Sequence, residues 1–358
     1  MSETVGEAPA MKEVDQEQEA PEQEKGKSRV VQALGSSLQQ VLVFVALIGI
    51  WIFFAFFAPN FAQLNIAVDI LSQSAYIGVM ALGATFVIAT AGIDLSVGTG
   101  MSLVAVCAGI FLAAPPYMNL PLGLGLLLVI LVGAALGLVN GFNIAYLGLP
   151  PFIATLAMMM AARGLALVLS GTQTISIANP GYRSLVQGNL IPSFELGGSL
   201  IRIPNSVVIF LGLAVVASLL LNKTLLGRYA LAIGSNEEAT RLSGVNVRLW
   251  KMLVYVTAGV FLAIGAILYS GRFGFVQPAE GVGFELQVIA AVVIGGTSLS
   301  GGRANILGTV VGALIMQTLT KGLQMMGLRQ EWQLVVTGVV VLLAVLVDIL
   351  RRRRSEAV

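Results

Sequence analysis

Long stretches without charged residues constrain this chain more than any other feature of its sequence. Asp, Glu, Lys and Arg are absent from residues 30–68, 70–93 and 95–162. A helix needs about 20 mainly apolar residues to cross a bilayer, so these stretches contain several crossings. Only 11% of the residues are charged, against about 25% in a typical soluble domain. The sequence therefore predicts an all-α, polytopic transmembrane helix bundle embedded in a lipid bilayer.

The composition also narrows the chemistry that the chain can perform. It has no histidine and a single cysteine, Cys107, which lies in an apolar run. The commonest proton shuttle and transition-metal ligand is therefore missing, and neither a disulfide framework nor a cysteine metal site is available. No cluster of basic and aromatic residues indicates a nucleic-acid partner. We expect no catalytic site, no metal, no cofactor and no nucleic acid.

Three parts are expected along the chain. Residues 1–29 carry eight acidic residues and no apolar face, which is typical of a disordered tail. The acidic start has the wrong charge for a secretory signal. Gly26-Lys27-Ser28 resembles the end of a phosphate-binding loop, but Pro21 stands where the first glycine is required, so we expect no ATP site there. Residues 30–350 are the predicted membrane domain, and 351–358 form a basic tail.

About ten candidate membrane helices, some of them interrupted, lie between the charges, prolines and glycines of this domain. They are residues 41–57, 66–89, 98–114, 120–144, 152–169, 205–221, 252–269, 286–294, 306–316 with extensions at both ends, and 332–347. The interrupted segments are candidates for re-entrant structure.

Basic residues predict the orientation of these helices. Lys25, Lys27 and Arg29 precede the first helix and four consecutive arginines, residues 351–354, follow the last, which predicts two cytoplasmic termini. With ten helices, residues 222–251 also fall in the cytoplasm, and this segment contains five basic residues. Residues 171–204 fall outside, where their Gly, Pro, Asn and Ser content suits a loop.

The cytoplasmic segment 222–251 contains a pattern typical of a short helix. Ser235 or Asn236 can serve as the N-cap, Glu237 and Glu238 suit the first turn, and Gly244 can end the helix. An exposed, charged helix of this kind offers a surface that a motor subunit could hold. On charge pattern alone, an ordinary solvated loop explains the same residues.

Two interruptions of apolar runs resemble each other. Residues 92–98 (GIDLSVG) and 296–302 (GTSLSGG) both replace apolar residues with glycines and hydroxyl side chains. Irregular backbone at membrane depth must be buried in protein or line a cavity, and repeated broken helices mark many transport pathways. Chance similarity between glycine-rich turns is the competing interpretation.

Four ionisable residues, Asp69, Asp94, Arg163 and Glu285, lie in or beside apolar segments. Each is expected to face the bundle interior, a cavity or an interface, because exposure to lipid is costly. Asp94 is the strongest functional candidate, since it lies in one of the interruptions. The structural alternatives are a helix cap for Asp94, an ion pair for Arg163 and a position at the outer surface for Glu285.

Several separate blocks of the sequence resemble one known family. In chain order they are residues 83–98, Asn140-Gly141, 151–156, Arg163-Gly164, 226–245 and 284–302. All resemble the permeases of ribose-type carbohydrate importers in the ATP-binding cassette superfamily. The similarity runs from the first helix to the C-terminal arginines, and several blocks in the same order are more specific than any single motif. The acidic N-terminal tail has no counterpart in this pattern.

This resemblance implies a bacterial inner-membrane complex of two permease copies, a cytoplasmic ATP-binding cassette ATPase and a periplasmic sugar-binding protein. The substrate would be a monosaccharide such as ribose, although inositol and autoinducer-2 are carried by members of the same family. The segment 222–251 would couple the permease to the ATPase. The predicted coupling residues are Gly234, Asn236, Glu237, Glu238, Ala239, Arg241 and Gly244.

Polar and aromatic residues near the interruptions are candidates for the translocation pathway, because neutral polyols are recognised by planar hydrogen-bonding groups and aromatic faces. They are Asp94, Ser96, Asn140, Asn143, Phe152, Thr155, Glu285, Gln287, Thr297 and Ser298. Interhelical packing explains such polar residues equally well. Two other functions stay open: an ion-coupled secondary transporter with Asp94 or Glu285 as the ion carrier, and, least favoured, an intramembrane enzyme.

Overall fold

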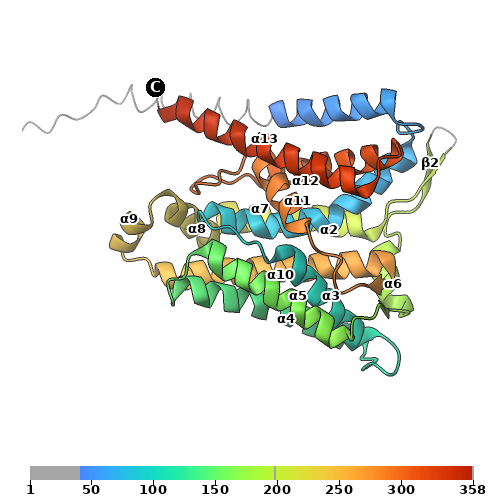
Figure 1. The fold of residues 1–358 in the computed structure, drawn as a ribbon, viewed down its shortest axis with the longest axis horizontal. Helices are drawn as coiled ribbons and strands as arrows, with labels where there is room; N and C mark the ends of the chain where they lie inside the picture. The colour runs from blue at the N-terminus through green and yellow to red at the C-terminus, as the bar shows by residue number, and fades with distance from the viewer. Residues whose placement is uncertain (1–40, 197–198, 357–358) are drawn as a thin grey trace, which may run out of the picture. The chain divides into compact units, whose positions relative to one another are not determined.

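The computed structural model describes residues 41–196 and 199–356. The predicted tail, residues 1–29, lies outside them. The described residues form mainly helices (Figure 1). After an apolar helix Val41–Phe57, the helices are α2 (Leu64–Ala89), α3 (Val97–Leu112), α4 (Leu122–Ala145), α5 (Pro151–Ser170), α6 (Pro180–Gln187), α7 (Asn205–Lys223), α8 (Leu225–Ser235), α9 (Glu237–Leu242), α10 (Val247–Phe273), α11 (Phe284–Ile294), α12 (Ile306–Met325) and α13 (Gln330–Glu356).

Two small antiparallel sheets complete the described structure. In one, β1 (Ile175–Ser176) pairs with β4 (Phe275–Val276), and Ile175 lies opposite Val276. In the other, β2 (Phe194–Leu196) pairs with β3 (Ser199–Ile201).

Six of the described helices, α2, α4, α5, α7, α10 and α12, are long and apolar enough to cross a membrane. Four shorter apolar helices are also present: Val41–Phe57, α3, α11 and the part of α13 that spans Gln330–Leu346. Each predicted range overlaps one of these ten helices. A multi-pass helical bundle is thereby confirmed, whereas the number of crossings stays a prediction.

α2 is the most deeply buried of the long apolar helices, followed by α12 and α10. α10 packs against α2 on one side and α4 on the other. α4 carries Gly133, Gly137 and Gly141 at intervals of four, and added Cβ atoms at these positions would collide with α10. Small residues at this spacing let two helices approach closely, which is the usual packing of membrane helices.

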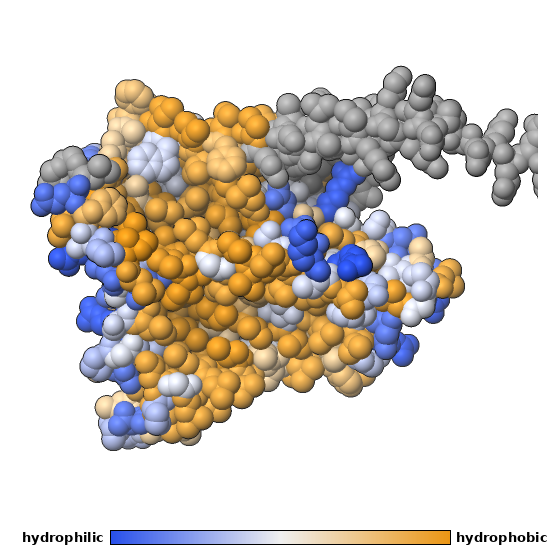
Figure 2. Space-filling view, turned by 180° about the vertical axis from the view of Figure 1, so that it is seen from behind, coloured by the Kyte–Doolittle hydropathy of each residue, from blue (hydrophilic) through white to orange (hydrophobic). Residues whose placement is uncertain are grey.

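The outward faces of the bundle are apolar. Large side chains such as Phe56 and Val168 are 82% and 77% exposed. In Figure 2, hydrophobic residues cover most of the visible face, and hydrophilic residues gather toward two opposite edges. This distribution suits a lipid-embedded middle and two aqueous ends.

The two ends of the bundle are defined by α9 and α6. α10 begins just after α9, and near its other end the hydroxyls of Ser270 and Tyr182, a residue of α6, are 2.6 Å apart (Figure 1). The segment 171–204, predicted as a loop, therefore contains a helix. Asn179 caps α6 by accepting a hydrogen bond from the Tyr182 N–H, and Pro180 occupies its first position, where proline is favoured.

Two interruptions divide the apolar segments. α2 ends at Ala89 and the chain resumes a helix at Val97, while α11 ends at Ile294 and α12 begins at Ile306. The similar sequences 92–98 and 296–302 lie at these two breaks. Both sequences therefore lie in non-helical breaks, and their place in a transport pathway stays a prediction.

Candidate functional site

The short helix α9 has the structure that its sequence predicts. Asn236 is the N-cap, and its Oδ1 accepts a hydrogen bond of 2.9 Å from the Ala239 N–H. Glu237 and Glu238 occupy the first turn, and Gly244 follows with a left-handed φ of 84°. The prediction of one helix in this segment was incomplete, because α8 precedes α9.

α9 presents charged side chains to solvent. Glu238 pairs with Arg241 at 2.6 Å, and this contact raises the pKa of Arg241. Glu237 pairs with Lys251 of α10, also at 2.6 Å. Leu242 is 78% exposed. α9 therefore presents both charged and apolar side chains to solvent.

Three backbone segments meet close to the start of α9, and we call this meeting point the glycine junction. It consists of Ala89 and Ala91 at the end of α2, Gly234 near the end of α8, and Gly301 with Gly302 between α11 and α12. The Gly302 N–H donates a 3.0 Å hydrogen bond to the Ala89 carbonyl oxygen. An added Cβ at Gly234 would collide with that oxygen and lie 2.6 Å from the Gly302 nitrogen. Among the described residues, backbone contacts thus join the two helix interruptions to the segment that leads into α9.

A buried polar network lies in the first interruption. The Ser96 N–H and hydroxyl both donate to Asp94 Oδ1, at 2.8 Å and 2.6 Å. Asn140 of α4 donates from Nδ2 to the Ser96 hydroxyl at 2.9 Å. Thr155 of α5 donates to the Ile93 carbonyl oxygen at 3.2 Å. Four of the predicted pathway residues, Asp94, Ser96, Asn140 and Thr155, are therefore brought together.

Asp94 is not the N-cap of α3, so its alternative role as a helix cap is wrong. Ser96 occupies the N-cap position of α3 and makes no side-chain cap hydrogen bond. Asp94 instead bonds the N–H of Ser96 itself. Its position is fixed locally, and only one of its two carboxylate oxygens is used in doing so.

The remaining predicted pathway residues are spread over the bundle. Thr297 and Ser298 lie in the second interruption, where the Thr297 hydroxyl accepts from the Asn305 N–H at 3.1 Å. Gln287 is bonded to Gln317 of α12. The Phe152 carbonyl oxygen accepts from the Thr155 hydroxyl at 3.4 Å, whereas its side chain is 55% exposed. Asn143 is half-buried on α4.

Glu285 and Arg163 differ in their surroundings. Glu285 is partly buried in the first turn of α11, where its carboxylate accepts from the Gly283 N–H at 3.1 Å and lies beside Gly98 at the start of α3. It therefore lies between α11 and the start of α3. Arg163 is exposed and pairs with no carboxylate among the described residues, so the predicted ion pair is absent from the described single chain.

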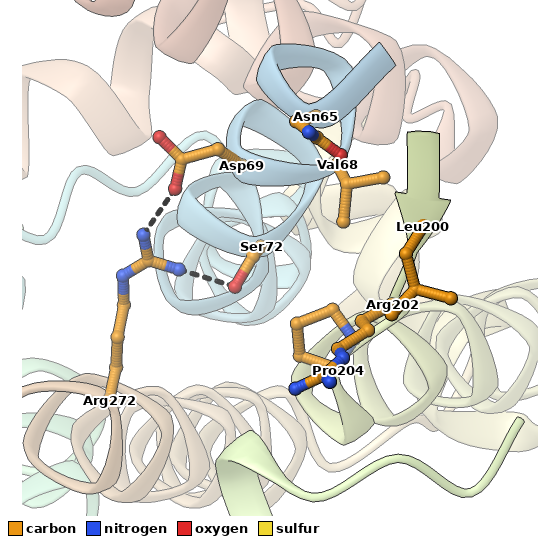
Figure 3. Close-up of a pocket in the computed structure, with 8 residues that line it drawn as sticks. All are labelled: Asn65, Val68, Asp69, Ser72, Leu200, Arg202, Pro204 and Arg272. Carbon is orange, nitrogen blue, oxygen red and sulfur yellow. Dashed lines mark hydrogen bonds and ion pairs between the residues drawn. The ribbon is translucent and has the colours of Figure 1, made fainter. Parts of the chain in front are cut away.

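The opposite end of the bundle holds an ion cluster. Asp69 of α2 accepts from Arg272 of α10 at 2.7 Å, and Arg272 also contacts Ser72 (Figure 3). Asp69 also accepts from Lys321 of α12 at 2.5 Å. A cavity of about 320 Å³ lies beside this cluster, with Arg202 on its other side (Figure 3). A second cavity of about 420 Å³ shares Ser72, Arg202 and Arg272 in its lining.

Sequence reasoning missed Arg272 and Lys321 as partners of Asp69. A signal was available, since both are single basic residues near the ends of apolar segments and are opposite in charge to Asp69. Tyr255, a buried residue of α10 near the first interruption, was also missed. A tyrosine in an apolar helix carries no signal of its own.

Comparison with known proteins places the chain in a family. Residues 66–345 match the family described as branched-chain amino acid transport system / permease component. The ribose import permease protein of Escherichia coli strain K12 is 39% identical over 312 residues, which cover 87% of this chain and 92% of that protein. The galactose/methyl galactoside import permease protein of the same strain is 35% identical over 328 residues, covering 88% and 95%.

The xylose transport system permease protein of Haemophilus influenzae strain Rd is 33% identical over 368 residues, covering 87% of this chain and 97% of that protein. No solved structure matches the chain. These similarities confirm the resemblance to ribose-type permeases that the separate sequence blocks indicate. The chain belongs to the permease family of the branched-chain amino acid transport system type, and its relatives there include import permeases named for ribose, galactose and xylose.

Proposed function

We propose that the chain is the membrane-spanning subunit of an ATP-driven importer that moves a monosaccharide across the bacterial inner membrane. Its partners are a cytoplasmic ATP-binding cassette ATPase, a periplasmic sugar-binding protein and a second copy of the permease. In this proposal all ten apolar helices enter the membrane and both termini lie in the cytoplasm, with α9 on the same side.

One observation carries the mechanism: α9 is attached through the glycine junction to both helix interruptions. A displacement of α9 by the ATPase reaches Ala89 and Gly302 through backbone atoms, without a flexible side chain in between. The first interruption holds the buried network of Asp94, Ser96 and Asn140. A partner can shift a protein between two conformations only if it binds one of them more tightly. An ATPase whose affinity for α9 changes with its bound nucleotide can therefore move the pathway from one conformation to the other.

The polar network favours a sugar over an amino acid as the substrate. Asp94 supplies a carboxylate, and Ser96, Asn140 and Thr155 supply hydroxyl and amide groups, while no basic residue is bonded to these groups in the described part of the chain. A free amino acid is a zwitterion: its ammonium group could pair with Asp94, but its carboxylate would meet no basic partner in this network. A neutral polyol needs only hydrogen-bonding partners.

Ribose is the first substrate to test, because the ribose import permease of Escherichia coli is 39% identical to the chain. Galactose and xylose follow from the other relatives, and inositol and autoinducer-2 are alternatives of the same transporter class. The test uses proteoliposomes that contain the permease, its ATPase and the binding protein, with leucine as a control substrate. We expect ATP-dependent uptake of a sugar and none of leucine. Uptake by the permease alone that a protonophore abolishes would instead support an ion-coupled transporter.

The position of α9 can be tested separately. A Cys107→Ser chain with Leu242→Cys carries its only thiol on the exposed side of α9. We expect an impermeant thiol reagent to label this cysteine in inside-out vesicles and to leave it unmodified in intact spheroplasts. Labelling in spheroplasts would place α9 outside the cell and contradict the importer proposal.

A further inference from the structure

Two buried polar atoms near the first interruption have no hydrogen-bond partner in the described structure. They are Oδ1 of Asn140 on α4 and the hydroxyl of Tyr255 on α10, and each residue is only 1% exposed. Nearly all buried polar groups in native proteins are paired, because an unpaired one loses its hydrogen bonds to water without replacement. Two such atoms at one place therefore require an explanation.

Both atoms lie beside the interruption that contains Asp94. An added Cβ at Gly92 would lie 2.7 Å from the Tyr255 hydroxyl, so this hydroxyl reaches the backbone two residues before Asp94. The Asn140 amide is oriented by the bond from its Nδ2 to Ser96, which leaves Oδ1 free. Ser96 in turn bonds Oδ1 of Asp94, while Oδ2 of Asp94 accepts no hydrogen bond from a described residue.

The three groups come from three different elements. Asp94 belongs to the break between α2 and α3, Asn140 to α4 and Tyr255 to α10. The break is connected to α9 through the glycine junction at Ala89 and Ala91. A movement of α9 that shifts the break therefore changes the spacing between these groups.

We propose that Asp94, Asn140 and Tyr255 form a binding site for hydroxyl groups of the transported polyol, closed in the conformation described here. This inference rests on the proposed function. The carboxylate and amide oxygens accept hydrogen bonds from neighbouring sugar hydroxyls, and the phenol both donates and accepts. The Tyr255 ring adds an apolar face for the C–H side of the sugar. The unpaired atoms acquire their partners only when substrate occupies the opened site.

Two tyrosines of α10 and α6 provide a matched test. Tyr255→Phe removes an unpaired hydroxyl, whereas Tyr182→Phe removes a buried hydroxyl that contacts Ser270 at 2.6 Å and the Ile267 carbonyl oxygen at 3.2 Å. Each purified variant is measured for its thermal unfolding midpoint, and each is reconstituted with the ATPase and binding protein for uptake of ribose, galactose and xylose.

For Tyr255→Phe we expect an unchanged or raised midpoint and uptake reduced by about tenfold, the effect of losing roughly one hydrogen bond to substrate. For Tyr182→Phe we expect a lowered midpoint, with uptake per assembled complex close to that of the unsubstituted protein. A lowered midpoint for Tyr255→Phe would show that its hydroxyl has a partner in the folded chain and would overturn the proposal.

A second variant covers the other side of the site. Asn140→Leu, which has the same number of side-chain heavy atoms, removes the unpaired amide oxygen together with the bond to Ser96, and is also expected to reduce uptake. Full sugar uptake by either assembled variant rejects the binding site while leaving the proposed function intact. Absence of sugar uptake by the unsubstituted complex rejects the proposed function itself. In that case the thermal unfolding midpoints of Tyr255→Phe and Tyr182→Phe still decide whether the Tyr255 hydroxyl is unpaired.

Discussion

Gly234 lies so close to the carbonyl oxygen of Ala89 that no side chain fits between α8 and the end of α2. The same oxygen accepts the hydrogen bond from the Gly302 N–H, so one atom of α2 contacts both other segments of the glycine junction. Gly234 is two residues before Asn236, the N-cap of α9. The short helix and the two interruptions therefore share one rigid point of contact.

Gly234→Ala is expected to disconnect α9 from the membrane helices. The added methyl group forces Ala89 or Gly302 to move, while the exposed surface of α9 is unchanged. We expect the variant to assemble with the ATPase and to hydrolyse ATP, but to take up sugar at least about tenfold more slowly, since small misplacements at such points have large effects on rate. Uptake and ATP hydrolysis are measured in the same proteoliposomes.

Gly164→Ala is the matched control, because an added Cβ at this helical position on α5 meets no atom within 4 Å. Its uptake and its ratio of sugar transported to ATP hydrolysed should equal those of the unsubstituted protein. An unchanged ratio in Gly234→Ala as well would refute the role of the junction.

The cap of α9 should be needed for binding of the ATPase. Asn236→Ala removes the hydrogen bond to the Ala239 N–H, and loss of such a cap costs about 1 kcal/mol of helix stability. α9 has only six residues, so we expect weaker retention of the ATPase during co-purification. Asn179→Ala removes the equivalent cap of α6 at the other end of the bundle and should retain the ATPase fully. Equal loss in both variants would indicate a general folding defect.

The ion cluster at the α6 end is expected to stabilise the fold. Asp69→Asn leaves Arg272 and Lys321 without their carboxylate, and their side chains are only 21% and 20% exposed. We expect the free energy of unfolding to fall by about 1–3 kcal/mol, because the substitution leaves two partly buried positive charges without their carboxylate partner. The measurement is the unfolding midpoint of the purified chain.

Glu331→Gln serves as the control for that measurement. Its pair with Arg329 has side chains that are 69% and 80% exposed, so solvent screens the interaction. Its midpoint should not change measurably, since exposed pairs contribute little. A midpoint for Asp69→Asn equal to that of the unsubstituted protein would show that the cluster is not needed for stability.

Asp94→Asn separates ATP-driven from ion-coupled transport. The substitution keeps the shape of the side chain but removes its charge, which an ion carrier requires. We expect reduced sugar uptake that remains ATP-dependent and equal with or without sodium and across pH 6 to 8. Transport that depends on sodium or on a pH gradient in the unsubstituted protein, and loses this dependence in Asp94→Asn, would favour the secondary transporter.

Local sequence patterns predicted the ten apolar helices and the capped start of α9, but neither α6 nor α8. Asn236, the two glutamates after it and Gly244 act within a few residues of one another, so their order alone indicates the helix. Asp94 was likewise recognised by its position in a break of an apolar run. The partners of Asp69 and the role of Tyr255 were not recognised, because both depend on residues distant in the chain.

The sequence by itself determined that this chain is a multi-pass helical membrane protein, which segments form its ten apolar helices, and which family it resembles. These properties follow from the order of apolar, charged and capping residues, and each is read within one segment. Only the tertiary structure decided that Ala89, Gly234 and Gly302 meet, and that Asn140 and Tyr255 hold unpaired atoms beside Asp94. Such contacts depend on how distant helices cross, and no local pattern specifies that crossing.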